Sequence, residues 1–132
     1  MKINKIDHIS IAVKDIKSFG KIVSDLFGAT FGPEQEVPDQ KVKVSFGSFN
    51  VSKLELISPI SSDSPISKFL DKKGDGLHHI CLEVENLEET LKKLKEKGVE
   101  PIGKISTGSY GKKIVFLNFK KTGGVLIELK EK

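Results

Sequence analysis

Apolar and polar side chains alternate in the first segment of the chain, which is the pattern of a strand with one buried face. Ile9, Ile11 and Val13 fall on one face of this strand, whereas His8 and Ser10 fall on the other. The sequence therefore predicts a half-buried strand whose polar side chains point away from the apolar layer.

The pattern then changes to helical spacing. Asp15 is a suitable N-cap, Gly28 is placed for a left-handed C-cap, and the apolar residues between them recur every three or four positions. Shorter alternating runs follow at about 29–35, 41–47 and 51–58, and turn residues separate them. The first half of the chain is thus expected to form a strand, a helix and three further strands.

The second half repeats this order after a short linking helix. That helix is expected over about 64–74, with Ser64 as its N-cap. A strand is predicted over 77–84, followed by a helix that Asn86 and Glu89 open in capping-box spacing. Three more strands are expected at about 99–105, 112–118 and 124–130.

The two halves also share residue types at matched positions. The segment around His8 recurs around His79, 71 residues further along the chain, and Leu54-Glu55-Leu56 recurs as Ile127-Glu128-Leu129. Self-similarity of this kind indicates duplicated structural units. A duplicated domain often builds one site between its halves.

We therefore predict an α+β fold in a single domain of residues 1–132. Two paired βαβββ modules, at about 5–59 and 76–130, are expected to form a curved mixed sheet around a central metal site. The linking helix joins the two modules.

The residues expected at that site are two imidazoles and two carboxylates. Alternation places all four on the strand faces opposite to the apolar ones: His8, Glu55, His79 and Glu128. Nitrogen and carboxylate donors favour Mn, Fe, Co, Ni or Zn over the oxygen cages of Ca, and four ligands leave octahedral positions open for a chelating substrate. The alternative is that the glutamates face solvent and that the histidines share a position only because one sequence was duplicated.

Composition excludes several classes of function. The chain has 37% apolar residues and no run of about 18 apolar positions that could span a membrane, so we expect no membrane partner. Cys81 is the single cysteine, which excludes an internal disulfide and, with no secretory segment ahead of the first strand, favours the cytoplasm. The net charge of +4 comes from scattered lysines without arginine, so nucleic-acid binding is not expected.

A glycine-flanked turn offers one further candidate for substrate binding. Ser109 opens this turn, whose backbone N–H groups could meet an oxyanion, and a plain turn is the alternative.

Segments spread over nearly the whole chain carry a family resemblance. They are Asp7-His8-Ile9-Ser10-Ile11-Ala12-Val13, Leu54-Glu55-Leu56, Gly76-Leu77-His78-His79-Ile80 and Thr122-Gly123-Gly124-Val125-Leu126-Ile127-Glu128-Leu129, together with 36–44 and 64–70. These segments resemble the vicinal oxygen chelate (glyoxalase/bleomycin resistance/dioxygenase) superfamily and, within it, the methylmalonyl-CoA epimerases.

The resemblance implies a metal-dependent epimerase of (R)- and (S)-methylmalonyl-CoA that is a homodimer. It maps His8, Glu55, His79 and Glu128 onto the ligands of a divalent metal such as Co, Mn, Zn or Ni. Glu128 is also the implied catalytic residue, which moves the proton at C2 of the acyl-CoA thioester. Gln40 lies in one of the resembling segments and is a second candidate for substrate binding.

Two features of the sequence depart from the family pattern or leave it open. Some relatives carry a glutamate at the position of Val44, so this chain must use water, another side chain or a different arrangement for the second proton transfer. The same ligand set also resembles some glyoxalase I enzymes, which leaves a lactoylglutathione lyase as an alternative. A third reading is a non-catalytic protein of this fold that binds a drug or another small ligand.

Overall fold

The computed structural model describes all 132 residues, which divide into two compact units. We call His8–His78 the N-terminal unit, and Met1–Asp7 together with His79–Lys132 the C-terminal unit. Strands β1 (Ile3–Ala12) and β6 (Gly76–Val84) each pass from one unit into the other. Both crossings fall at a histidine that the sequence analysis singled out.

The elements follow the predicted order. Those of the N-terminal unit after β1 are α1 (Ile16–Phe27), β2 (Thr30–Phe31), β3 (Gln35–Val37), the short helix η1 (Pro38–Gln40), β4 (Val42–Phe49), β5 (Ser52–Pro59) and α2 (Pro65–Lys73). Those of the C-terminal unit after β6 are α3 (Leu87–Glu96), β7 (Pro101–Thr107), η2 (Ser109–Gly111), β8 (Lys113–Leu117), η3 (Phe119–Lys121) and β9 (Ile127–Glu131). None of the helices is long and apolar enough to cross a membrane.

The strands pair in the order β2-β4-β5-β1-β6-β9-β8-β7, and β3 pairs with β4. The same connection occurs in each half: β1 is parallel to β5 and β6 is parallel to β9. A parallel pair requires a long crossover connection, and the helix and strands between the partners provide it. The predicted α+β class and the βαβββ repeat are confirmed.

One predicted strand is wrong in detail. The run expected over 29–35 is divided into β2 and β3, because Pro33 lies between them. Proline has no backbone N–H to give to a sheet ladder, so pairing stops there.

The predicted caps form at the helix starts. The Asp15 carboxylate accepts a hydrogen bond from the Ser18 backbone N–H, which lowers the pKa of that carboxyl, and Gly28 adopts the left-handed conformation at φ 75° after α1. Ser64 caps α2 and Asn86 caps α3 in the same way. These local contacts determine where each helix begins and therefore which side faces the strands.

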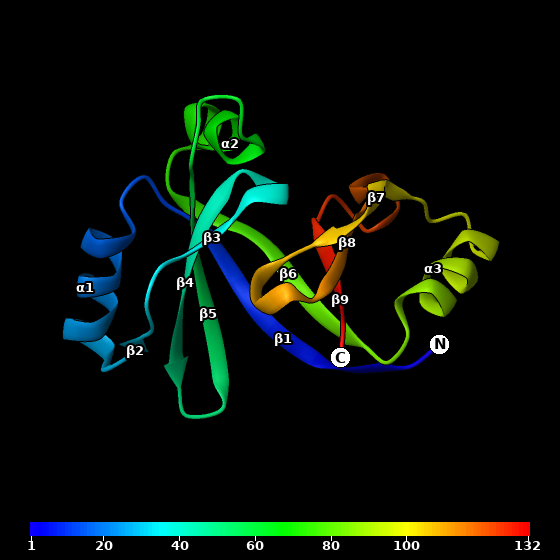
Figure 1. The fold of residues 1–132 in the computed structure, drawn as a ribbon, viewed down its shortest axis with the longest axis horizontal. Helices are drawn as coiled ribbons and strands as arrows, with labels where there is room; N and C mark the ends of the chain where they lie inside the picture. Colours follow the sequence, from blue (N-terminus) through cyan, green and yellow to red (C-terminus); the bar gives the residue numbers. More distant parts are fainter. The chain divides into compact units, whose positions relative to one another are not determined.

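In the N-terminal unit, α1 and α2 cover opposite faces of the β4–β5 pair (Figure 1). Val44 and Ile57 are register partners on one face and pack with Ile66 and Leu70 of α2. Leu56 lies on the other face, where it packs with α1. The α2 face is also the face of Glu55, because side chains two residues apart share a face of a strand.

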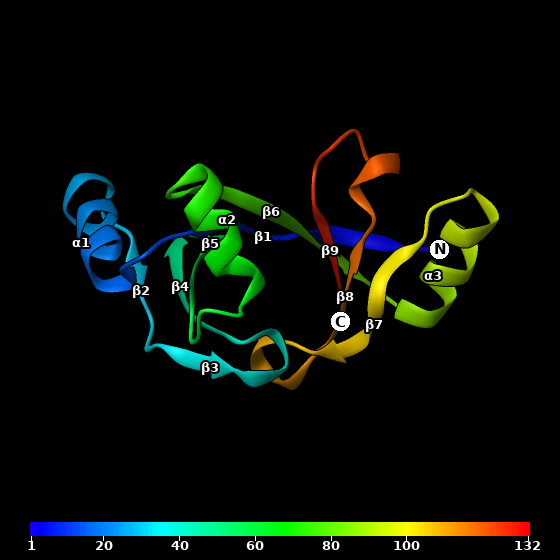
Figure 2. The ribbon, with the colours of Figure 1, turned by 90° about the horizontal axis from the view of Figure 1, so that it is seen from above.

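In the C-terminal unit, α3 packs beside β7 and close to the N-terminus of the chain (Figure 2). Leu87 is fully buried against Val84, Val115 and Leu129, and the Met1 ammonium group lies 3.4 Å from a Glu89 carboxylate oxygen of α3. This apolar layer is again formed by the strand residues that alternate with the polar ones.

A glycine allows one close contact on the α1 side. The Phe31 ring packs against Gly47, so that a Cβ at position 47 would be 2.5 Å from the nearest ring carbon. No other residue type can occupy this position without moving the ring.

We predict that Gly47→Ala lowers the free energy of unfolding by about 1–3 kcal/mol, because overpacking forces the ring out of its place. Gly76→Ala is the matched control, since a Cβ there meets nothing within 4 Å. Urea denaturation of both variants measures the effect. An equal stability of the two variants would contradict the prediction.

Candidate functional site

The first pair of candidate ligands lies in the N-terminal unit. His8 is on β1 and Glu55 is on β5, and the two residues are only 2% and 5% exposed. The parallel register places Glu55 beside Ser10, two residues after His8 on the same strand face. The His8 Nε2 atom is 3.6 Å from Glu55 Oε1. The alternative in which Glu55 merely faces solvent is therefore wrong.

The second pair repeats this arrangement in the C-terminal unit. His79 of β6 and Glu128 of β9 are both buried, and His79 Nε2 is 2.7 Å from Glu128 Oε2. Cys81 stands beside Glu128 in the parallel register, as Ser10 stands beside Glu55. The duplication of the sequence thus reappears as a duplicated three-residue arrangement.

An aromatic ring supports each imidazole. Phe46 is the antiparallel partner of Glu55. Its ring packs edge to face with the His8 ring, and the two ring centroids are 5.2 Å apart. Phe116 is likewise the partner of Glu128, and its ring meets that of His79 at 5.1 Å. These contacts restrict the orientation of both histidine rings, because each ring is bounded by a flat apolar side chain.

The pairs offer the donors that a transition-metal ion prefers. Each unit supplies one imidazole nitrogen and one carboxylate oxygen, at strand positions with almost no solvent access. Nitrogen and oxygen donors together suit Mn, Co, Ni or Zn, and carboxylates offset the charge of a dication. The residues present therefore fit a divalent metal.

Ser10 is a contact that sequence reasoning missed. Its hydroxyl donates a hydrogen bond of 2.7 Å to Glu55 Oε1, and Ser10 has no exposed surface. The alternation of β1 already placed Ser10 on the face of His8, but nothing in the sequence pairs it with a residue 45 positions away.

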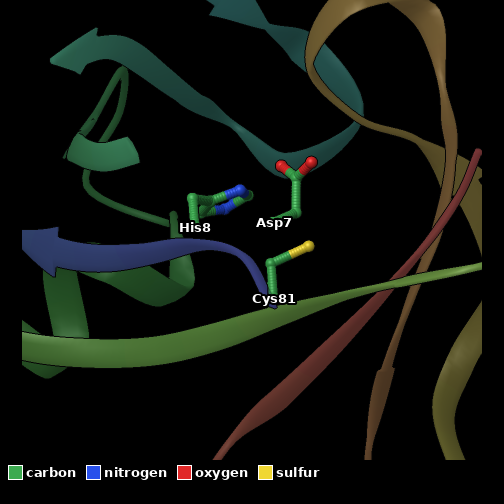
Figure 3. Close-up of side chains that lie close together, drawn as sticks. All are labelled: Asp7, His8 and Cys81. Carbon is green, nitrogen blue, oxygen red and sulfur yellow. The ribbon is translucent and has the colours of Figure 1, made fainter. Parts of the chain in front are cut away.

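A buried ion pair in the C-terminal unit was also missed. Lys130 Nζ lies 3.2 Å from Asp7 Oδ2, and both side chains are almost fully buried. Asp7 of β1 and Cys81 of β6 lie close together (Figure 3), with a carboxylate oxygen within 4.8 Å of the sulfur. The Asp7–Lys130 pair could not be expected from the sequence, because Lys130 is one of 22 lysines.

The two candidates for substrate binding lie in short helices. Gln40 is the last residue of η1 and is half-buried, and Ser109 is the first residue of η2. Tyr110, which follows Ser109, has a left-handed backbone at φ 57° and an exposed side chain. The roles of Gln40 and Ser109 stay predictions.

A cavity of about 440 Å³ lies elsewhere in the N-terminal unit. Its lining includes Gly20 of α1, Phe31 of β2 and Ser45 of β4. Because Ser45 and Phe46 point to opposite faces of β4, this cavity is on the α1 side, away from Glu55.

Comparison with known proteins assigns the family. Residues 7–116 match the model of the Glyoxalase/Bleomycin resistance protein/Dioxygenase superfamily. The chain belongs to this superfamily. The match includes His8, Glu55 and His79, and it ends before Glu128.

Several relatives of the chain are named as epimerases of acyl-CoA thioesters. The chain is 36% identical to the mitochondrial methylmalonyl-CoA epimerase of Mus musculus, covering 98% of this chain and 74% of the relative. It is also 36% identical to the ethylmalonyl-CoA/methylmalonyl-CoA epimerase of Cereibacter sphaeroides, covering 98% of each. A variant of the Streptomyces coelicolor methylmalonyl-CoA epimerase, solved in complex with 2-nitronate-propionyl-CoA, superposes with a TM-score of 0.93 at 28% identity, covering 99% of this chain and 96% of that one.

We predict that Lys130→Met lowers the free energy of unfolding by about 3–5 kcal/mol, because it leaves the Asp7 carboxylate buried without its cation. The matched control is Lys132→Met, which removes an exposed lysine 3.9 Å from Glu85 and should leave the free energy of unfolding nearly unchanged, because solvent screens the pair. Denaturant titration measures both. The double variant Asp7→Asn with Lys130→Met should recover most of the loss, and a single variant as stable as the control would argue against the buried pair.

Proposed function

We propose that this protein is a methylmalonyl-CoA epimerase, and that His8, Glu55, His79 and Glu128 together hold one divalent metal ion. The observation that carries the proposal is the buried His–Glu pair, which occurs once in each unit at matched strand positions. The full-length similarity to epimerases named for this substrate supports the choice of reaction. Co, Mn, Zn and Ni all suit the donor set.

The reaction inverts one carbon of the substrate. The C2 atom lies between a thioester carbonyl and a carboxylate, so the electron pair left when the C2–H bond breaks is delocalised onto the thioester oxygen as an enolate. Return of a proton to the opposite face of C2 gives the other epimer. A bound divalent cation would supply electrostatic stabilisation of the oxygen on which charge develops.

Glu128 is the proposed carrier of one proton. Its carboxylate is buried and faces His79 across the parallel strand pair, so its position is restricted by the strands on both sides. A carboxylate that takes a proton from carbon acts as a general base, which contributes about 10²–10⁴-fold to the rate.

The carrier on the opposite face is not Val44. Val44 has no ionisable group, and it is buried in the apolar cluster with Ile57 and Leu70. This strand position therefore cannot supply the second proton carrier. A water molecule or another side chain serves this role in the proposed reaction.

The proposal also covers the CoA part of the substrate, the oligomeric state and the location of the protein. All 22 residues in the Lys and Arg count are lysines, so lysines would meet the phosphates of CoA as point charges. We further propose a homodimer, by analogy with the family, and a cytoplasmic location, which the single buried Cys81 suits.

Loss of one imidazole should abolish metal binding and catalysis together. We predict that His79→Ala binds no stoichiometric metal and incorporates no deuterium at C2 of methylmalonyl-CoA in D₂O, as followed by metal analysis and mass spectrometry. His78→Ala is the matched control, because His78 packs against Phe69 and is not a proposed ligand. Full deuterium exchange by His79→Ala would defeat the proposed role of His79. If the unmodified protein consumed a glutathione hemithioacetal and incorporated no deuterium into methylmalonyl-CoA, the lyase alternative would be favoured.

Replacing the proposed base should separate chemistry from substrate binding. Glu128→Gln keeps the side-chain size and one oxygen donor but cannot accept the proton, so deuterium exchange should fall by about 10²–10⁴-fold. The variant should still bind a substrate analogue, which calorimetry measures. An exchange rate within a factor of about two of the unmodified protein would assign the proton to another group.

A further inference from the structure

We propose that Ser10 is a positioning residue that holds Glu55 in one orientation for metal binding, and that Cys81, at the matching place beside Glu128, does not provide an equal restraint. The two carboxylates then differ in their support, with a hydroxyl donor beside Glu55 and a thiol beside Glu128. This inference rests on the proposed metal site and concerns how that site is supported.

The contact between Ser10 and Glu55 is built into the strand register. The two residues are direct partners in the parallel β1–β5 pair, and the hydroxyl is 2.7 Å from Oε1. Both side chains are buried, so water does not compete for the bond. A hydroxyl that donates to a carboxylate forms a strong, charge-assisted hydrogen bond, which restricts the carboxylate torsion.

The bond also distinguishes the two oxygens of Glu55. A serine hydroxyl has one hydrogen to donate, and here it is directed to Oε1. His8 Nε2 is 3.6 Å from that same oxygen, which is beyond hydrogen-bond range, so the Ser10 hydroxyl makes the shorter contact with it. Ser10 thus anchors one oxygen of Glu55 from a position outside the proposed ligand set.

Glu128 is oriented in a different way. His79 Nε2 lies 2.7 Å from its Oε2, so one close polar neighbour of Glu128 is itself a proposed ligand. A ring nitrogen that donates a hydrogen bond has no lone pair for a metal, so His79 Nε2 could not donate to Glu128 while that same nitrogen bound a cation. Its direct strand neighbours are Cys81 of β6 and Phe116 of β8.

The strand neighbour that corresponds to Ser10 is Cys81. It is the direct partner of Glu128 in the β6–β9 pair, and it is fully buried. A thiol is a much weaker donor than a hydroxyl. A single atom, oxygen in one half and sulfur in the other, therefore makes the two halves of the duplicated site chemically unequal.

The expected effect is a loss of metal affinity when the hydroxyl is removed. Partners that orient a ligand from outside the coordination sphere typically change metal affinity or activity by about 10–100-fold. Ser10→Ala should therefore weaken Co²⁺ binding by about 10–100-fold. Ser10→Cys, which keeps a side chain of similar shape but donates weakly, should show much of the same loss.

The test is calorimetric titration of Co²⁺ into the metal-free protein, with urea denaturation of each metal-free variant alongside. Ser45→Ala is the matched control, because Ser45 is also buried and its hydroxyl donates to the Gly32 carbonyl oxygen on the α1 side of β4. That variant should lose stability but keep its Co²⁺ affinity. Ser10→Thr retains the hydroxyl and should restore most of the affinity lost in Ser10→Ala, and Cys81→Ser should bind Co²⁺ at least as tightly as the unmodified protein.

The outcomes separate this inference from the proposed function. If the unmodified protein binds no Co²⁺, both proposals fail. If it binds one Co²⁺ per chain and Ser10→Ala binds within twofold of that affinity, the metal site stands and the role of Ser10 is overturned. Equal losses of affinity in Ser10→Ala and Ser45→Ala would also overturn it, because they would reveal a general effect of stability.

Discussion

The register of two parallel strand pairs is the constraint on which the candidate site depends. The β1–β5 pair places Glu55 beside Ser10, and the β6–β9 pair places Glu128 beside Cys81. A slip of one residue in either pair would turn the carboxylate to the opposite face, since successive side chains of a strand alternate. The helix α1 or α3 within each crossover packs on the apolar face and so helps to hold the register.

Burial of so many polar groups is possible because nearly every one meets a partner of suitable chemistry. Glu55 accepts from Ser10, His79 faces Glu128, and Lys130 neutralises Asp7. An unpaired charge in the same surroundings would cost several kcal/mol, which is why removing one partner is more damaging than removing both. Each of these buried polar groups therefore depends on its own partner.

Local signals explain why much of the fold could be predicted from the sequence. Helix starts at Asp15, Ser64 and Asn86 depend on contacts within three residues, and the structure has all three caps. The division of the strand expected at 29–35 was missed, although Pro33 was visible, because the alternation of its neighbours outweighed one residue without an N–H. The candidate site residues followed from the sequence repeat, because it places a histidine and a glutamate at matched positions in each half.

The sequence by itself determined the two modules, the apolar and polar faces of their strands, and the histidines and glutamates of interest, because these depend on spacing along the chain. Only the tertiary structure decided that Ser10 bonds Glu55, that Lys130 pairs with Asp7, and that Val44 lies in an apolar core. Each of these contacts joins separate strands, and its existence depends on a register that no local pattern specifies. Two strands with suitable faces can pair in several ways, and the packing of the helices selects one.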